Sequence, residues 1–296
     1  MTPDQLARWL AARPRVLDGA MGSELLRRGV TEAEQLWGVG ALLRRPEAVR
    51  AIHRDHAIAG AEALTAATFR VAPYALRRVG QGDHAARLAS LAIELARAGA
   101  SDADRDALVF ASQTTLEDCY RPDLVPSADV LEREHASTSL ALASAGPDAL
   151  LLETFNTIGE ARTAARAAAA TGMPVLVTFT CMAGGRLLSG EDAGAAAAAV
   201  SLPGVVALGV NCTRRRDVMA ALVRMAPATD LPLVAYANDA WYGTDSAFLT
   251  AAPSDPESYA CAALAWSAAG ARLVGGCCGT RPEHVAAVAA ALRHES

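Results

Sequence analysis

Residues 271 to 280 read Ala-Arg-Leu-Val-Gly-Gly-Cys-Cys-Gly-Thr, an apolar run that ends in glycines and two adjacent cysteines. A third cysteine, Cys212, follows another apolar run, Val205–Val210. Parallel strands of one sheet end at the same edge, so the sulfur atoms of Cys212, Cys277 and Cys278 can meet there if both runs are such strands. Three thiolates at one point predict a zinc site with one open coordination position.

The rest of the chain repeats a pattern of short apolar runs followed by alanine-rich amphipathic segments. We predict strands at Arg15–Leu17, Ala63–Ala66, Leu108–Ser112, Ala149–Glu153, Val175–Thr180, Val205–Val210, Leu233–Tyr236 and Arg272–Gly275. We predict helices at Pro46–Ala59, Gly82–Ala98, Ala128–Ala145, Gly159–Thr171, Ala193–Ser201, Asp217–Ala226, Pro256–Ala269 and Pro282–Arg293. This alternation predicts an α/β fold, a single (β/α)₈ TIM barrel domain over residues 1–296. An open doubly wound sheet is the alternative, weakened as a dinucleotide binder because no Gly-x-Gly-x-x-Gly follows the first strand.

Composition narrows the class of protein. The chain carries 32 acidic and 27 basic residues, a net charge of −5, which argues against nucleic acid as a partner. Charges interrupt every apolar run well short of the ~20 residues that span a bilayer, and the N-terminus lacks a signal-peptide pattern. We therefore expect a cytoplasmic protein that acts on small-molecule substrates. Its six cysteines are then buried residues or metal ligands rather than a disulfide framework.

The vicinal cysteines need an unusual backbone if both are to bind one metal. Gly275, Gly276 and Gly279 surround them and accept backbone angles that other residues avoid. Adjacent cysteines rarely reach disulfide geometry, so a structural disulfide is not expected. The alternative is two small buried cysteines beside a glycine turn.

Other candidate ligands receive a structural interpretation. Cys181 and Cys261 lack glycine-rich surroundings and are expected in the core. Cys119 falls in a long loop, and its role is left open. His53 and His56 stand three residues apart on a predicted helix, a spacing that can bind metal. Two solvated histidines on an amphipathic helix are the favoured interpretation.

The predicted ligand set also points to a kind of chemistry. Zn²⁺ with three cysteine thiolates carries a net charge of −1. A substrate thiol at the fourth position loses its proton because the metal lowers its pKa, and the thiolate stays electron-rich. Hydrolytic zinc sites instead favour neutral histidines, which leave more positive charge to acidify water. The cysteines therefore favour thiol alkylation over hydrolysis.

Two carboxylates stand at predicted strand ends. Asp18 follows the first strand and precedes two glycines, where it could receive a substrate ammonium beside backbone N–H groups that hold a carboxylate. Its alternative role is to cap the following turn. Glu153 ends a very apolar strand, where a carboxylate is costly to bury unless it is paired. Its partner would be a substrate ammonium or, alternatively, Arg162, Arg166 or a histidine.

Weaker candidates lie at other strand ends. Thr68 ends the second strand and Asn238 follows the seventh. Trp241–Tyr242 come just after and would either face a cationic sulfonium or pack at the rim. The long connections 70–82 and 113–127 leave carboxyl strand ends and are expected to form part of a lid or substrate wall.

Three stretches together resemble the homocysteine S-methyltransferase family: Asp18–Leu25 (Asp-Gly-Ala-Met-Gly-Ser-Glu-Leu), Gly209–Cys212 (Gly-Val-Asn-Cys) and Gly275–Thr280. The resemblance runs from about Arg15 to the last helix. It implies a zinc-bearing barrel enzyme that methylates homocysteine to methionine. The implied donor is a sulfonium such as S-methylmethionine or S-adenosylmethionine, while other relatives use betaine or methylcobalamin.

The resemblance also implies roles by position. The catalytic zinc ligands would be Cys212, Cys277 and Cys278, and the amino-acid end of homocysteine would meet Asp18, Glu153 and backbone groups around Met21 and Gly22. The sequence departs from the family's pattern at two places, and these leave the identities of the methyl donor and of the acceptor open. Ala67-Thr68 replaces a common Asn-Thr, and residues 111–120 replace a glycine-rich loop. Methyl transfer to another thiol or selenol, and a barrel that binds zinc or a thiol without turnover, remain alternatives.

Overall fold

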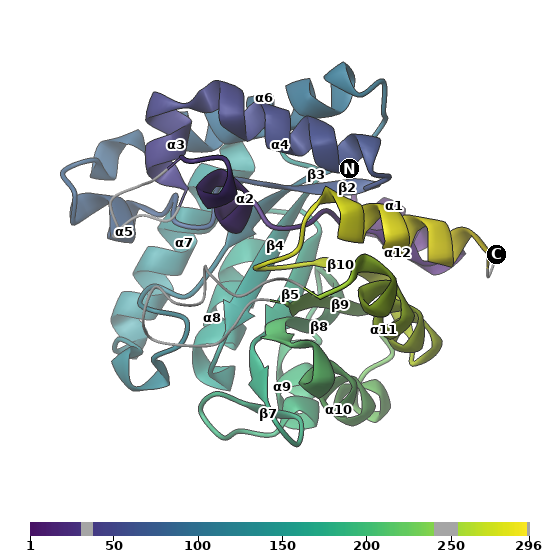
Figure 1. Cartoon of the computed structure of the whole chain (residues 1–296). Helices are drawn as coiled ribbons and strands as arrows, with labels where there is room; N and C mark the ends of the chain where they lie inside the picture. Colours follow the sequence, from purple (N-terminus) through teal and green to yellow (C-terminus); the bar gives the residue numbers. More distant parts are fainter. Residues whose placement is uncertain (31–37, 240–253, 295–296) are drawn as a thin grey trace.

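The computed structural model describes residues 1–30, 38–239 and 254–294. Eight parallel strands form one sheet that nearly closes as a barrel (Figure 1). Around the sheet they run β1 (Arg15–Val16), β10 (Ala271–Gly276), β9 (Leu233–Asn238), β8 (Val205–Arg214), β5 (Val175–Phe179), β4 (Ala149–Phe155), β3 (Leu108–Gln113) and β2 (Ala63–Ala66). A single bridge from Leu17 to Ala63 joins β1 to β2. All eight predicted strands are confirmed, and an open doubly wound sheet is excluded.

The eight predicted helices are also confirmed, with ends shifted by a few residues. The described helices, which include these eight, are α1 (Pro3–Ala12), α2 (Gly22–Arg27), α3 (Val39–Arg44), α4 (Pro46–Ile58), α5 (Pro73–Arg77), α6 (Ala85–Asp102), α7 (Ala128–Ser144), α8 (Ile158–Ala169), α9 (Ala193–Val200), α10 (Arg215–Met225), α11 (Pro256–Ala268) and α12 (Pro282–His294). Short 3₁₀ turns lie at Gly82–His84, Pro122–Leu124 and Ala226–Ala228. Among the described helices, none is long and apolar enough to cross a membrane.

Two hydrophobic layers hold the barrel together, because alternate residues of a strand point to opposite faces. Leu273 and Phe110 point into the barrel and pack with the other interior side chains. Their neighbours Val274 and Val109 point outward and pack under the helices. The interior is therefore filled, and space for chemistry is left at the ends of the strands.

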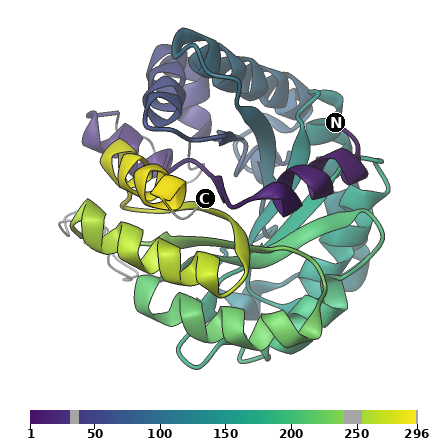
Figure 2. The same cartoon turned by 90° about the vertical axis from the view of Figure 1, so that its right-hand side faces the viewer.

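Helix α1 covers the amino-terminal end of the barrel, as Figure 2 shows. Thr2 begins it with a capping box: its hydroxyl accepts from the backbone N–H of Gln5, and the Gln5 side chain accepts from the Thr2 N–H. Leu6 and Leu10 are fully buried and pack with Leu17 and the interior residues. The opposite, carboxyl-terminal end is the one that carries the loops.

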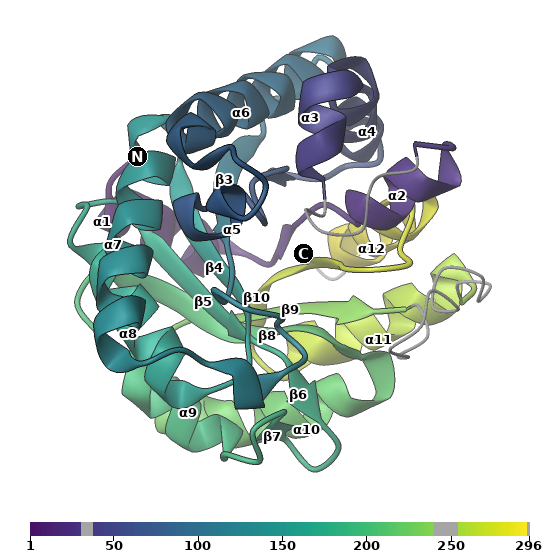
Figure 3. The ribbon, with the colours of Figure 1, turned by 90° about the vertical axis from the view of Figure 1, so that its left-hand side faces the viewer.

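Those loops contain more regular structure than expected (Figure 3). The connection 70–82 includes α5, and 113–127 includes the 3₁₀ turn at Pro122–Leu124. A small antiparallel hairpin, β6 (Cys181–Met182) and β7 (Arg186–Leu187), follows β5. Cys181 is buried there, as expected.

Two expectations were wrong. His53 and His56 are fully buried on α4, where burial lowers the pKa of His53 to about 3 and that of His56 to about 4. Gly99 of α6 lets the two helices approach, since a Cβ there would lie 2.7 Å from the His53 Cβ. Cys261 is exposed rather than in the core. Helix α11 is apolar on nearly all sides, so its sequence does not reveal which side faces inward.

Candidate active site

The sulfur atoms of Cys212, Cys277 and Cys278 lie within 4.8 Å of one another at the carboxyl-terminal end of the barrel. Cys212 comes from β8 and the other two follow β10, with β9 between them. Ligands at the usual Zn–S distance of about 2.3 Å lie about 3.8 Å apart in a tetrahedron. The Cys212 and Cys278 sulfurs are 3.6 Å apart, so the trio has the size of a metal site.

Local backbone geometry builds the cluster. Cys212 has a φ of 45°, in an irregular part of the pairing between β8 and β9. Such a left-handed residue is unusual for a side chain other than glycine and turns the sulfur toward the barrel mouth. After β10, Gly279 has a φ of 82° and closes a turn in which the Thr280 N–H donates to the Cys277 carbonyl at 3.1 Å.

Contacts among the three sulfurs shift the pKa values of the thiols in opposite directions. Hydrogen bonds with Cys277 and Cys278 lower the pKa of the Cys212 thiol well below its usual value. The same contact with Cys212 raises the pKa of the thiols of Cys277 and Cys278. Three thiolates within 4.8 Å of one another would repel each other unless a cation lay at their centre. The donor set therefore fits a thiophilic metal ion.

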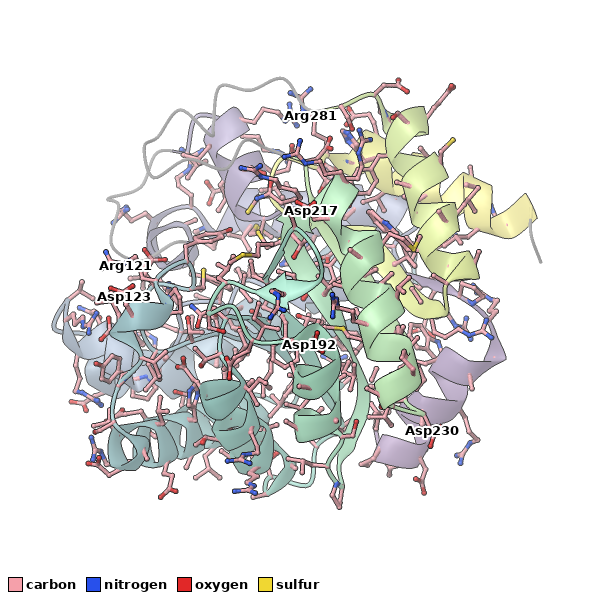
Figure 4. All side chains as sticks on the ribbon, turned by 90° about the horizontal axis from the view of Figure 1, so that it is seen from below. Arg121, Asp123, Asp192, Asp217, Asp230 and Arg281 are labelled. Carbon is pink, nitrogen blue, oxygen red and sulfur yellow. The ribbon has the colours of Figure 1, made fainter. Side chains whose placement is uncertain are left out.

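Polar side chains surround the Cys212 sulfur. The Tyr120 hydroxyl lies 3.1 Å from it, and the Asn238 amide donates to it at 3.7 Å. Asn238 was predicted to contact substrate, and the structure places it beside the cluster. Tyr120 follows β3 in a loop that also carries the ion pair of Arg121 and Asp123, 2.6 Å apart and labelled in Figure 4.

The buried carboxylate of Glu153 stands next to the cluster. Ser112 and Tyr236 donate hydrogen bonds to it, the latter at 3.0 Å, and the Asn211 amide lies at 3.5 Å. Burial raises the pKa of Glu153 to about 7, against these lowering hydrogen bonds. The proposed arginine partners Arg162 and Arg166 do not hydrogen-bond to it in the described structure.

Asp18 is the second buried carboxylate at this end of the barrel. Its Oδ2 accepts from the Thr65 backbone N–H of β2 at 2.8 Å, and among the described hydrogen bonds none joins its side chain to the turn that follows it. Burial is the main reason that its pKa is raised to about 8, and the charge of Glu153 adds to this. Both carboxyl groups lack a cationic side-chain partner among the described hydrogen bonds and ion pairs.

The remaining predicted residues are placed less directly. Thr68 is buried, and its hydroxyl donates to the Ser112 carbonyl at 2.8 Å, which ties the loop after β2 to β3. Met21 and Gly22 begin α2, and the Met21 side chain packs against the outer core. Cys119 is buried in the loop before Tyr120. Trp241–Tyr242 lie outside the described residues.

Sequence reasoning missed four side chains that complete the site: Ser112, Tyr120, Asn211 and Tyr236. A signal was available for three of them, because Ser112, Asn211 and Tyr236 are polar residues close to carboxyl ends of barrel strands. Tyr120 lies in an irregular loop and had no such signal.

Comparisons with known proteins point to one family. A family model described as homocysteine S-methyltransferase matches residues 15–292. A homocysteine S-methyltransferase of Escherichia coli K12 is 33% identical over 298 residues, covering 93% of this chain and 94% of the relative. The homocysteine S-methyltransferase YbgG of Bacillus subtilis is 28% identical and covers 94% of both chains. The crystal structure of the Escherichia coli homocysteine methyltransferase in its metallated form superposes with a TM-score of 0.80 at 31% identity, covering 96% of each chain.

Proposed function

The chain belongs to the homocysteine S-methyltransferase family, and from that premise we propose that it transfers a methyl group from a sulfonium donor to the sulfur of homocysteine, giving methionine. The observation that carries the proposal is the cluster of three thiols beside two buried carboxyl groups. In this proposal one barrel domain holds the thiol end of the acceptor at the cysteines and its amino-acid end at the carboxyl groups.

Cys212, Cys277 and Cys278 would hold a zinc ion. Their sulfurs lie within 4.8 Å of one another, and a soft thiolate set suits Zn²⁺. When bound, zinc would supply the positive charge that keeps a substrate thiol deprotonated at neutral pH. The Asn238 amide at 3.7 Å from Cys212 would stabilise negative charge on that sulfur and fix its orientation.

Glu153 and Asp18 would bind the ammonium group of homocysteine. Their raised pKa values, about 7 and about 8, reflect buried carboxyl groups without a cation nearby. A substrate ammonium supplies that cation and draws both groups into their ionised form. The backbone N–H groups around Met21 and Gly22, at the start of α2, would take the substrate carboxylate.

The transfer itself needs no acid or base from the protein once the acceptor is a thiolate. The acceptor sulfur forms a bond to the methyl carbon, the bond from that carbon to the donor sulfur breaks, and its electron pair returns to the donor as a neutral thioether. Cysteine thiolates and carboxylates at this end of the barrel favour a cationic donor, such as S-methylmethionine or S-adenosylmethionine. Positioning of the two sulfurs then lowers the barrier.

A donor and acceptor screen on reduced, zinc-loaded protein tests the proposal. We expect one zinc per chain and methionine formation from homocysteine with a sulfonium donor, S-methylmethionine or S-adenosylmethionine. Turnover with betaine or a methylcobalamin partner alone would reject the sulfonium donor. Faster turnover of another thiol or a selenol would reject homocysteine as the preferred acceptor. Stoichiometric zinc without product from any pair would identify a barrel that binds metal without catalysis.

A further inference from the structure

Two loops of the site lie side by side because β1 pairs with β10. We call residues 18–23 the anchor loop, since it would hold the amino-acid end of the acceptor, and residues 276–280 the cysteine loop. The Gly276 N–H donates to the Asp18 carbonyl at 2.9 Å, which joins the two loops at their bases. The cysteine loop carries two of the sulfurs and the anchor loop carries Asp18, so the distance between the loops would bear on how far apart the thiol end and the amino end of a bound acceptor can lie.

Two hydroxyl groups join the loops farther out. Thr280 is fully buried, and its hydroxyl accepts from the Ala20 N–H at 3.3 Å while donating to the Cys277 carbonyl at 2.7 Å. The Ser23 hydroxyl accepts from the Gly279 N–H at 3.0 Å. Each side chain therefore bonds the loop opposite its own, and Thr280 bonds the residue that carries one of the sulfurs.

The atoms around the Thr280 side chain are closely packed. A Cβ at Gly276 would lie 2.2 Å from the Thr280 hydroxyl oxygen, and a Cβ at Gly19 would lie 3.1 Å from it. Behind the anchor loop, the buried His56 ring packs against Gly19, where a Cβ would come within 2.7 Å of the ring. Arg281, labelled in Figure 4, follows directly and leads into α12. The anchor loop is thus held between the buried His56 side chain of α4 and the cysteine loop.

We propose that Thr280, assisted by Ser23, is a positioning residue that sets the spacing between the cysteine loop and the anchor loop and so selects the chain length of the aminothiol acceptor. This inference rests on the proposed function, because it takes homocysteine as the acceptor. Cysteine is one methylene shorter and cannot place its sulfur at the cysteines and its ammonium at the carboxylates at the same fixed spacing. A pocket that recognises length alone discriminates one methylene by roughly 10- to 200-fold.

The first experiment tests the link without any substrate. Hydrogen–deuterium exchange is measured on apo and zinc-loaded protein for peptides covering residues 18–25. In the wild type, zinc at the cysteine loop should slow exchange in the anchor loop, because Thr280 transmits the ordering. Thr280→Val keeps the shape but removes the hydroxyl, and the zinc-induced protection should be lost. Thr280→Ser keeps the hydroxyl and should restore it.

A matched control is Thr138→Val. Thr138 is also buried, but its hydroxyl donates only to the Glu134 carbonyl within α7, at 2.8 Å. This variant should keep the wild-type protection of residues 18–25. Equal protection in Thr280→Val and wild type would overturn the link between the loops. Loss of stoichiometric zinc in Thr280→Val would also overturn it, because Thr280 would then support the metal site alone.

The second experiment tests the consequence for specificity. The ratio of kcat/KM for homocysteine to that for cysteine is compared in wild type, Thr280→Val, Thr280→Ser, Ser23→Ala and Thr138→Val. In Thr280→Val we expect a rise of about tenfold in KM for homocysteine and a fall of about tenfold in the ratio. An unchanged ratio would refute the role in chain-length selection. If wild-type protein turns over no homocysteine, the proposed function fails, while the exchange experiment still decides whether the loops are linked.

Discussion

At the residue scale, two backbone positions in left-handed conformation flank the site. Thr154 and Cys212 have φ values of 64° and 45°, each worth about 1–3 kcal/mol of strain. The Asn211 side chain joins them, because its Oδ1 accepts from the Thr154 N–H at 2.8 Å and from the Thr178 hydroxyl at 2.9 Å. This buried network holds Glu153 and Cys212, the neighbours of Thr154 and Asn211, in fixed positions.

Replacing Cys277 by Ser should remove zinc and activity together. A serine hydroxyl is not deprotonated as a thiol is and binds zinc poorly, so activity should fall by at least about a hundredfold. Metal content and methionine formation measure both effects. Cys261→Ser, at the exposed cysteine of α11, should change neither. Full zinc occupancy in Cys277→Ser would refute its assignment as a ligand.

Replacing Glu153 by Gln should weaken acceptor binding while zinc stays bound. The amide keeps the shape and one acceptor oxygen, so it can still accept from Ser112 or from Tyr236, but it cannot carry the charge that attracts an ammonium. We expect KM for homocysteine to rise by about tenfold or more. Glu134→Gln, at another buried glutamate that pairs with Arg77, is the control and should leave KM unchanged. An unchanged KM in Glu153→Gln argues against an ammonium contact.

Proton release offers a separate test of the two carboxyl groups. Their folded-state pKa values, about 8 for Asp18 and about 7 for Glu153, lie above the ordinary values of 3.8 and 4.5. The folded protein therefore holds more protons than the unfolded chain between about pH 4 and 8, and this contribution to stability falls as pH rises through that window.

An ammonium ligand should reverse this and expel protons. Calorimetric titration of zinc-free protein with methionine, which has no thiol to ionise, is compared near pH 7 in buffers of different ionisation enthalpy. We expect a buffer-dependent heat that reports proton release, reduced in Glu153→Gln. A heat that is the same in every buffer would contradict the assignment of these groups to the ammonium.

At the element scale, the spacing of β8 and β9 depends on a glycine. A Cβ at Gly209 would lie 1.9 Å from the Val234 carbonyl oxygen, so only glycine allows the strands to pair in this register. The register matters for chemistry because Cys212 stands three residues further along β8 and Asn238 ends β9.

Gly209→Ala should therefore destabilise the fold and disturb the cysteines. We expect a loss of about 3 kcal/mol or more in the free energy of unfolding, since backbone must move to admit the methyl group. Gly159→Ala is the control: Gly159 lies in α8 with open space around it, and alanine there should be neutral or stabilising by up to about 1 kcal/mol. Chemical denaturation measures both, and equal stability of the two variants would contradict the packing argument.

At the scale of the whole molecule, the barrel separates stability from chemistry. Helix α1 closes the amino-terminal end with Leu6 and Leu10, while the cysteines and carboxyl groups occupy the other end. Cys277 packs against the same interior cluster as Leu6 and Leu10. The filled barrel interior therefore lies between helix α1 and the candidate active site.

Leu10→Ala should lower stability without changing substrate binding. Removal of a fully buried leucine side chain costs about 2–5 kcal/mol, because a cavity remains between α1 and the barrel interior. Leu43→Ala, at a half-exposed leucine of α3, should stay within about 0.5 kcal/mol of wild type. Thermal unfolding and the KM for homocysteine are measured for both variants. A raised KM in Leu10→Ala would show that the two ends of the barrel are coupled.

The order of strands and the place of the thiol cluster were predictable from the sequence. Each strand is a short apolar run between helical segments, and parallel strands must end at one edge, so Cys212 and Cys277 could be placed together from their positions after two such runs. The burial of His53 was not predictable, because it depends on how closely α6 approaches through Gly99. The exposure of Cys261 at the surface was not predictable either, because α11 carries apolar residues on nearly all sides.

The sequence by itself determined the barrel, the gathering of three cysteines and the presence of two carboxylates at strand ends, since these follow from local periodicity and from the direction of parallel strands. Only the tertiary structure decided which partners those groups have: Tyr120 on the Cys212 sulfur, Ser112 and Tyr236 on Glu153, and the Thr280 hydroxyl between the two loops. The physical reason is that these contacts join residues about 40 to 260 positions apart, and the side chains meet only after the sheet has closed and the glycines have set the distances between backbones.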